Sequence, residues 1–499
     1  MYRSKTVLYS IMRIVVFLLI LLLCIYVVSR VFQYKPGADR YQQFLACANQ
    51  CDVLILGDSQ ATNGIFPMEL WKKYGISSFN LSGANATLPL CYWILENALL
   101  YSSPQLVILG LPDESMQKKA PETIGNLHTA LDGWPLNRTK WNAIADLTEE
   151  FESQNRVSFP VSMEFVVPFA KYHSRWSQLT KNDFFPKAKI GKGGTLRVGV
   201  LAEDEYELID EQDCMPEEGP GFDYLRRIFE LCSRKGIQVL TLHMPYPPKE
   251  ERQRAANTVR KVSGEYGYHM LDLPRLKGLI DPVTDMCDCI THLNPSGAYK
   301  LTDYLGAYIT AEYGILDHRN DSDYSAWQNE INAYIDEKLK EIRAAEKYKD
   351  ALMLAHDEDF SVYIAVRSGA PLHKIMQFLQ NIPRDHMMPG SEEYFYSCEE
   401  NPLYELDGLE EDTAYFLIVD RDDGRIDELP GEYSDEYDTS FGLIRVHSDE
   451  YTEATLERNG KEYCWPVKSD EGDLFITFID RRTGLPAANL SYSLAQKHR

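Results

Sequence analysis

Short apolar runs that alternate with longer amphipathic segments are the feature that most constrains the fold of this 499-residue chain. Each run has the length of a strand and is bounded by turn-forming or polar residues, which is typical of strands buried on both faces. The alternation predicts an α/β fold with a parallel, doubly wound sheet and helices on both of its faces. We expect strands at 52–56, 77–81, 105–110, 237–242 and 269–273, and helices at 66–74, 89–101, 222–235, 249–266 and 295–313.

Three polar segments lie where such a sheet binds ligands, at the carboxyl ends of its strands. Gly57-Asp58-Ser59-Gln60 follows the first strand, where a Ser presents both its hydroxyl and its backbone N–H. Asn80-Leu-Ser-Gly83-Ala-Asn85 follows the second strand, where Gly83 allows close backbone approach and Asn85 offers an amide donor. Asp288-Cys-Ile-Thr-His292-Leu-Asn-Pro-Ser-Gly297 precedes a helix and contains a His that can activate a Ser hydroxyl.

Each segment also has an ordinary structural explanation. Ser59 fits the N-cap of a helix, and the Asn80–Asn85 segment fits a turn rich in Asn, Gly and Ser. A single His such as His292 is more often structural than catalytic. Their joint order and position along the chain are what indicate a nucleophilic site.

Together these residues resemble the SGNH (GDSL) hydrolase superfamily over roughly residues 51–317. The resemblance rests on Gly57-Asp58-Ser59, on Gly83 and on the ending His292-Leu-Asn-Pro-Ser-Gly297. It implies a flavodoxin-like sheet and a Ser–His–Asp site without a metal or cofactor. In this resemblance Ser59 is the nucleophile, His292 is the base, and the N–H groups of Ser59 and Gly83 stabilise the oxyanion.

The third block of the family departs from its pattern here. Its Gly-x-Asn-Asp corresponds to Gly110-Leu-Pro-Asp113, in which Pro112 replaces an Asn that donates to the oxyanion. Proline has no N–H to donate, and the loss of one oxyanion donor costs ~10²–10³ in rate. Asn85 is a candidate replacement donor, and an oxyanion hole with fewer donors is the alternative.

The acid of the site also departs from the family pattern. The family has Asp-x-x-His, but Cys289 stands three residues before His292. If this segment forms a helical turn, Asp288 lies on the same face as His292, which makes Asp288 the first candidate. Asp285 is the second candidate, and a Ser–His dyad without an acid is the third interpretation.

A narrower resemblance points to membrane-anchored bacterial SGNH proteins, similar in layout to proteins of D-alanyl transfer to teichoic acid and of polysaccharide O-acetylation. It rests on residues 168–176 (PFAKYHSRW), 291–294 (THLN), 317–319 (DHR) and 324–327 (YSAW). It implies transfer of an acetyl or D-alanyl-like group onto a cell-envelope polysaccharide or teichoic-acid-like acceptor, beside a membrane-bound O-acyltransferase partner. Ester hydrolysis is an alternative, because an acyl-Ser can react with water or with a sugar hydroxyl. A catalytically inactive scaffold for envelope assembly is the other alternative.

His173, Arg175 and Trp176 lie within this narrower resemblance and are candidates for an acceptor groove. Hydrogen bonds from the His and Arg and stacking of the Trp ring would suit a sugar acceptor. A structural cap between a helix and a loop is the alternative, and the sequence favours it slightly.

The N-terminus contains fifteen consecutive apolar residues, 14–28, flanked by Arg13 and Arg30. Both arginines can extend to lipid headgroups, which lengthens the span towards the ~20 residues that a bilayer needs. The residues after the run fit a signal-peptide cleavage site poorly, so the sequence favours an uncleaved anchor over a cleaved signal peptide. We therefore expect a single-pass protein of a bacterial cell membrane, with its body outside the cytoplasm.

The net charge of −24 argues against a nucleic-acid partner, because phosphate neutralisation needs a basic surface. Residues 391–450 alone contain 20 Asp and Glu against three Arg and no Lys, which is typical of a solvated surface. Short apolar runs and the turns Asp423-Gly424 and Asn459-Gly460 predict β-hairpins in the same region. We expect an anchor at 1–32, a linker at 33–50, the α/β domain at 51–322, an amphipathic helix at 323–347 and an acidic β-rich accessory domain at 348–499.

Overall fold

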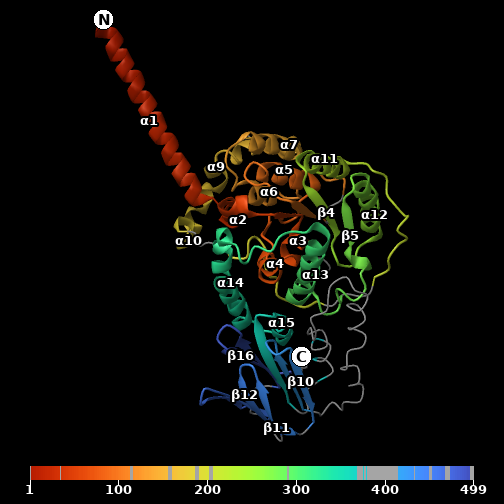
Figure 1. Cartoon of the computed structure of the whole chain (residues 1–499). Coiled ribbons are helices and arrows are strands. Elements are labelled where there is room, and N and C mark those ends of the chain that lie inside the picture. Colours follow the sequence, from red (N-terminus) through yellow and green to blue (C-terminus); the bar gives the residue numbers. More distant parts are fainter. Residues whose placement is uncertain are drawn as a thin grey trace, which may run out of the picture.

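The structure of the chain is a computed structural model that begins with a long apolar helix, α1 (Tyr2–Phe32), projecting away from the body (Figure 1). Its part Tyr9–Phe32 is long and apolar enough to span a membrane. The described residues are 2–494 apart from 34, 113–115, 155–159, 186–189, 202–205, 289–291, 368–371, 373–374, 376–377, 379–413, 432, 449–451 and 467–472.

Five parallel strands form one sheet in the order β2-β1-β3-β4-β5. All five predicted strands are present within one residue of their expected bounds. They are β1 (Val53–Leu56), β2 (Ser78–Asn80), β3 (Leu106–Gly110), β4 (Gln238–His243) and β5 (His269–Asp272). In register, Val53 pairs with Ser78 on one side and with Leu106 on the other. The carboxyl ends of β1, β2 and β3 therefore lie next to one another.

Helices cover both faces of this sheet, as the sequence predicts. Successive strand residues point to opposite faces, so Leu54 and Leu56 pack in one apolar core and Val53 and Ile55 in another. The first core includes α5 (Leu88–Ala98), α7 (Arg138–Gln154), α11 (Pro220–Lys235) and α12 (Glu250–Glu265), and the second includes α3 (Ser59–Gly64), α4 (Pro67–Tyr74) and α13 (Pro295–Tyr313). Burial on both faces explains why the central strands β1 and β3 are apolar throughout.

Residues 33–50 differ from the predicted linker. They form α2 (Lys35–Cys47) and a 3₁₀ turn, η1 (Ala48–Gln50), rather than an extended connection. Tyr41 and Phe44 are buried three residues apart and pack on Trp134 and Phe79 of the α/β core. Two buried aromatics on a short helix make a weak sequence pattern, because most of the surrounding residues are polar.

The C-terminal third contains two antiparallel sheets. Strands β8 (Phe360–Val366), β9 (Tyr415–Asp420), β10 (Arg425–Pro430), β15 (Leu474–Asp480) and β16 (Leu485–Tyr492) form the first, and β11 (Tyr433–Thr439), β12 (Gly442–Ser448), β13 (Thr452–Arg458) and β14 (Lys461–Pro466) form the second. The predicted turn Asn459-Gly460 joins β13 to β14, with positive φ at both residues, as a two-residue hairpin requires. Part of the acidic segment 391–450 lies outside the described residues.

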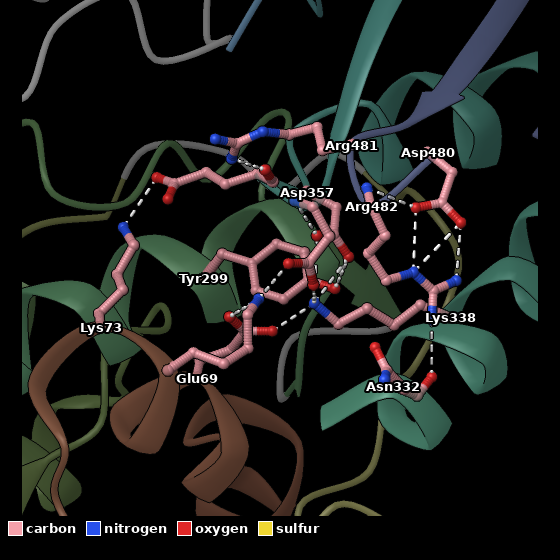
Figure 2. Close-up of polar contacts among 12 residues, drawn as sticks. Glu69, Lys73, Tyr299, Asn332, Lys338, Asp357, Asp480, Arg481 and Arg482 are labelled. Carbon is pink, nitrogen blue, oxygen red and sulfur yellow. Dashed lines mark hydrogen bonds and ion pairs between the residues drawn. The ribbon is translucent and has the colours of Figure 1, made fainter. Parts of the chain in front are cut away.

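The α/β part and the C-terminal part meet at α14 (Ser325–Arg343) and α15 (Tyr348–Leu354); in Figure 1, α15 lies below α4 and α13. Lys338 of α14 is buried there among the carboxylates of Glu69, Asp357 and Asp359 (Figure 2). Its Nζ lies 3.0 Å from Asp357 Oδ2 and 2.7 Å from Asp359 Oδ2, and it also contacts Glu69 Oε1. These carboxylates are close enough to share a metal ion, but in this structure they pair with the ammonium groups of Lys338 and Lys72.

The buried His356 lies near this junction and makes the stability of the fold depend on pH. Its Nδ1 lies 3.2 Å from Ser296 Oγ at the start of α13. Burial, together with the positive charges of Lys300 and Arg421, holds the pKa of His356 well below its ordinary value. The folded protein therefore keeps this imidazole neutral at pH values where the unfolded chain binds a proton.

We expect the free energy of unfolding to fall as the pH drops below about 6.5, by up to ~1.4 kcal/mol per pH unit for this group. The stabilisation is complete above the unfolded-state pKa and is lost in the window down to the folded-state pKa. His356→Gln should reduce this pH dependence, whereas His173→Gln, at an exposed position, should not. Thermal unfolding of the unmodified protein and both variants between about pH 7.5 and 5.5 measures how stability depends on pH. Equal pH slopes for all three proteins would contradict the prediction.

Candidate active site

Ser59 lies directly beyond the carboxyl end of β1. Asp58 is the N-cap of α3, and its Oδ1 accepts a hydrogen bond from the Gln60 N–H at 2.9 Å, which begins the helix at Ser59. The Ser59 side chain is half-buried, so its hydroxyl is both held and accessible. The predicted strand-to-helix turn at Gly57–Gln60 is therefore present.

Gly57 makes this turn sterically feasible. Its φ is +145°, and an added Cβ would lie 2.9 Å from the carbonyl oxygen of Gly110 on β3. The nearby Gly83 has an ordinary φ, and an added Cβ there would meet nothing within 4 Å. A side chain is therefore excluded by the surroundings of Gly57 but not by those of Gly83.

We expect Gly57→Ala to reduce the free energy of unfolding by about 1–3 kcal/mol. The added Cβ strains the backbone at its positive φ and pushes the end of β1 away from β3. Gly83→Ala is the matched control, and it should change stability by less than about 0.5 kcal/mol. Thermal or urea unfolding of both variants checks this difference. Equal stability of the two variants would contradict it.

His292 comes to Ser59 from a hairpin formed by β6 (Met286–Asp288) and β7 (His292–Leu293). Its Nε2 lies 2.8 Å from Ser59 Oγ, although 233 residues separate the two in the chain. This distance is that of a hydrogen bond between a nucleophile and its base. The side chains of Ser59 and His292 therefore lie in direct hydrogen-bonding contact.

The residues after His292 hold it in place. Asn294 is fully buried, caps α13 by accepting from the Gly297 N–H, and donates from Nδ2 to the Thr284 and Met286 carbonyls. Pro295 follows at the first turn of α13, where its missing N–H costs nothing. The ending His292-Leu-Asn-Pro-Ser-Gly297 thus sets the position of His292 and the start of the helix together.

The two candidate acids stand in different situations. Asp285 is fully buried, and its carboxylate accepts from Ser296 Oγ at 2.7 Å and from Lys300 Nζ at 2.8 Å, so it is engaged with α13. Asp288 ends β6, where its backbone pairs with that of His292. The side chain of Asp288 lies outside the described part of the structure, so its role as the acid stays a prediction.

The segment Asn80–Asn85 lies against the turn Gly57–Gln60. Asn80 Nδ2 donates to the carbonyls of Ala61 and Ile65, at 2.8 and 3.0 Å, which ties the end of β2 to α3. The N–H of Gly83 donates to the carbonyl of Gly57 at 3.1 Å. An oxyanion role for this N–H requires that bond to be exchanged for one to substrate. Asn85, at φ 50° and half-buried, is the candidate side-chain donor of the same loop.

The counterpart of the family's third block, Gly110-Leu-Pro-Asp113, begins at the last residue of β3. The N–H of Leu111 donates to the Leu242 carbonyl at 2.8 Å, which continues the pairing with β4. Pro112 is buried and has no N–H, so its backbone offers the site no donor. Asp113 lies outside the described residues.

Two further side chains, those of Arg252 and Gln60, lie near the turn that carries Ser59. Arg252 of α12 interacts electrostatically with Asp58 and stacks on the Tyr246 ring at 4.3 Å, and burial lowers its pKa to about 10, against the opposing effect of Asp58. Gln60 is buried beside Ser59, and its side-chain amide makes no hydrogen bond to the residues that the structure describes. The GDS motif marks the position of Gln60, but only the fold brings Arg252 near it.

His173, Arg175 and Trp176, the candidates for an acceptor groove, lie at the base of α1. They belong to the 3₁₀ segment η2 (His173–Gln178), which follows α9 (Pro168–Tyr172). Arg175 Nη1 donates to the carbonyls of Phe32 and Gln33, at 2.5 and 3.0 Å, and its Nη2 pairs with Asp183. The His173 ring contacts the Ala170 carbonyl through Nδ1, at 3.0 Å. The acceptor groove itself stays a prediction.

The segment 317–327 of the narrower resemblance has structural contacts. His318 Nε2 lies 2.7 Å from Asp52 Oδ2 at the start of the sheet, and its ring stacks on Tyr324. Trp327 is fully buried and packs against Trp71 of α4. These residues join α14 to the α/β part.

No protein-family model, curated protein or solved structure matches this chain. The geometry of the site therefore carries the functional interpretation.

Proposed function

We propose that this protein is a serine acyltransferase of the SGNH type, which moves an acetyl or D-alanyl-like group onto cell-envelope glycan. The observation that carries the proposal is the 2.8 Å contact between Ser59 Oγ and His292 Nε2. Both side chains are half-buried, so a substrate can reach them. Two residues 233 positions apart are brought into the arrangement that acyl transfer requires.

The arrangement supports a two-step reaction. In the first step Ser59 Oγ attacks the acyl carbonyl of an ester donor while His292 Nε2 takes the hydroxyl proton. His292 then returns the proton to the departing alcohol as the ester bond breaks, which leaves an acyl-Ser59. In the second step a glycan hydroxyl attacks the acyl-Ser59, again through His292, and the acyl group passes to the acceptor.

The sheet topology supports the SGNH assignment. The strand order β2-β1-β3-β4-β5 is that of flavodoxin-like proteins, in which ligands bind where β1 and β3 meet. Ser59 follows β1, and Gly83 follows β2 and contacts Gly57. The loops that carry Ser59 and Gly83 thus come from neighbouring strands.

The end of α1 supports a retained membrane anchor and a body outside a bacterial cytoplasm. Ser29 and Gln33 are buried in the body, and Gln33 Nε2 donates to the Asp132 carbonyl at 3.0 Å. Cleavage after Gln33 would remove these contacts. An anchored body of this kind suits a glycan acceptor at the membrane surface and a multispanning acyltransferase partner.

A second function is a catalytically inactive scaffold, and two observations favour it. The Gly83 N–H is occupied by the Gly57 carbonyl, and Pro112 supplies no donor. A site short of oxyanion donors stabilises the transition state poorly. Ester hydrolysis is the remaining alternative, since water can take the place of the glycan hydroxyl.

Trapping of the acyl-enzyme tests the proposal and separates these functions. The full chain is incubated with an activated acetyl ester, acid-quenched and digested, and the acetylated residue is located by mass spectrometry. We expect acetyl on Ser59, and its transfer to added envelope glycan faster than its release as acetate. Faster release of acetate indicates hydrolysis. Absence of label from Ser59 under every condition would favour the scaffold and contradict catalysis.

A further inference from the structure

A group of short helices surrounds the point where α1 enters the body. It consists of α9, η2 and α10 (Lys181–Phe184), and we call residues 168–185 the collar. Phe169 packs its ring edge-on against Phe32 of α1 at 5.4 Å, and Arg175 binds the last carbonyls of that helix. Figure 1 shows α9 and α10 on either side of the base of α1.

The collar exposes large aromatic side chains. Trp176 is 72%, Phe185 73% and Phe184 54% exposed, although each would normally be buried. Local contacts hold the backbone that carries them, because Thr180 and Asp183 form a capping box and Asp183 pairs with Arg175. The aromatic side chains are therefore presented outwards by a braced segment.

The collar lies at the level where α1 leaves its apolar stretch. The side chains from Tyr9 to Val28 are exposed, and the first buried one is Ser29. Residues 11–28 span about 27 Å as a helix, close to the ~30 Å of a hydrocarbon core. The Phe169 N–H donates to Ser29 Oγ at 3.3 Å, so α9 begins where a membrane crossed by α1 would end.

The collar also differs from the rest of the chain in charge. Residues 168–185 contain Lys171, Arg175 and Lys181 against one acidic residue, Asp183, whereas the whole chain has a net charge of −24. Trp at a membrane boundary, together with basic side chains, matches the composition of the interfacial region of lipid bilayers. The acidic remainder of the body would be repelled by anionic headgroups.

We propose that the collar inserts Trp176, Phe184 and Phe185 into the interfacial region of the same bilayer leaflet from which α1 emerges. This seats the body on the membrane surface in one orientation instead of leaving it to swing on α1. His173, Arg175 and Trp176 then serve membrane seating instead of an acceptor groove. The inference rests on the membrane-spanning role proposed for α1 and is independent of the chemistry of Ser59.

Fluorescence of Trp176 in lipid tests this. The full chain is reconstituted into nanodiscs of phosphatidylcholine and phosphatidylglycerol, with and without bromine on the acyl chains near the glycerol backbone. Subtracting the emission of Trp176→Phe from that of the unmodified protein isolates Trp176. Because Trp176 is exposed, its replacement by Phe should preserve the fold, which circular dichroism checks.

We expect the Trp176 emission to be lost in brominated lipid and to be shielded from aqueous iodide. The matched control is Trp176→Phe/Leu485→Trp, which moves the indole to an exposed position on β16, and it should be quenched by iodide and not by bromine. Trp176 emission that is unchanged by bromine and quenched by iodide would overturn the proposal. So would emission that is insensitive to bromine and becomes shielded from iodide only as protein concentration rises, because a second copy would then cover the collar.

Alkaline carbonate extraction keeps this test separate from the proposed function. Release of the chain from membranes by carbonate would contradict the spanning role of α1, and the collar proposal with it. A membrane-retained chain with Trp176 in water would overturn the collar proposal alone. Neither result bears on acyl transfer at Ser59.

Discussion

Ser59→Ala should abolish acyl transfer, with a loss of at least about 10³-fold in kcat/KM. The variant removes the atom that forms the acyl-enzyme. It should leave the fold unchanged, because among the residues that the structure describes Ser59 Oγ has a hydrogen-bond partner only in His292. Formation of acylated glycan and release of free acid, measured in parallel, give the rate of each outcome. Both should fall together if one acyl-Ser59 precedes them.

His292→Ala should cause a loss of similar size, and the double variant should be scarcely worse than either single one. A nucleophile and its base act as a unit, so their separate losses do not add. Ser322→Ala, at an exposed position outside the site, is the control and should retain full activity. Unchanged glycan acylation in Ser59→Ala would rule out Ser59 catalysis and leave the scaffold function.

Lys338→Met should reduce the free energy of unfolding by about 3–5 kcal/mol. Burial alone would lower the pKa of Lys338, but the carboxylates of Asp357, Asp359 and Glu69 raise it well above its ordinary value, so it stays charged. Removing the ammonium leaves these acidic groups buried around an uncharged side chain (Figure 2). Lys72 remains paired with Glu69 and Asp359. The junction of α14 with α4 and β8 should therefore weaken.

Lys340→Met provides a matched control on the same helix. Lys340 is exposed and pairs with Glu337 one turn away, so its loss should change stability by less than about 1 kcal/mol. Thermal unfolding of both variants in the same detergent compares them directly. Equal melting temperatures would show that the buried ion cluster contributes no more than a surface pair.

The strands and the principal helices of the α/β part could be predicted because their signals are local. A buried strand such as Leu106–Gly110 is apolar throughout, and a helix such as α11 repeats apolar residues at helical spacing and ends at Gly236. The position of Ser59 at the carboxyl edge of the sheet could also be predicted, because Ser59 directly follows a strand and parallel strands end at the same edge. The bracing of His292 by Asn294 lies within one short segment and is equally local.

The contacts between distant segments could not be predicted in this way. Residues 33–50 read as a linker because the two aromatics of α2 show no clear pattern until they meet Trp134 and Phe79. The sequence makes Arg175 a candidate for an acceptor groove, but its hydrogen bonds to the carbonyls of Phe32 and Gln33 could not be predicted from the surrounding segment. Both outcomes depend on where α1 and α2 dock, which no local pattern states.

By itself, the sequence determined the parallel strands, the apolar helix at the N-terminus and the identity of the nucleophile and base candidates, because burial, helical period and turn chemistry act over a few residues. Only the tertiary structure decided that Ser59 and His292 lie 2.8 Å apart, that the Gly83 N–H binds the Gly57 carbonyl, and that Lys338 is buried among acidic groups. Each of these joins segments that are distant in the chain. Their distances follow from how the sheet, the hairpin and α14 pack, and that packing is a property of the whole chain.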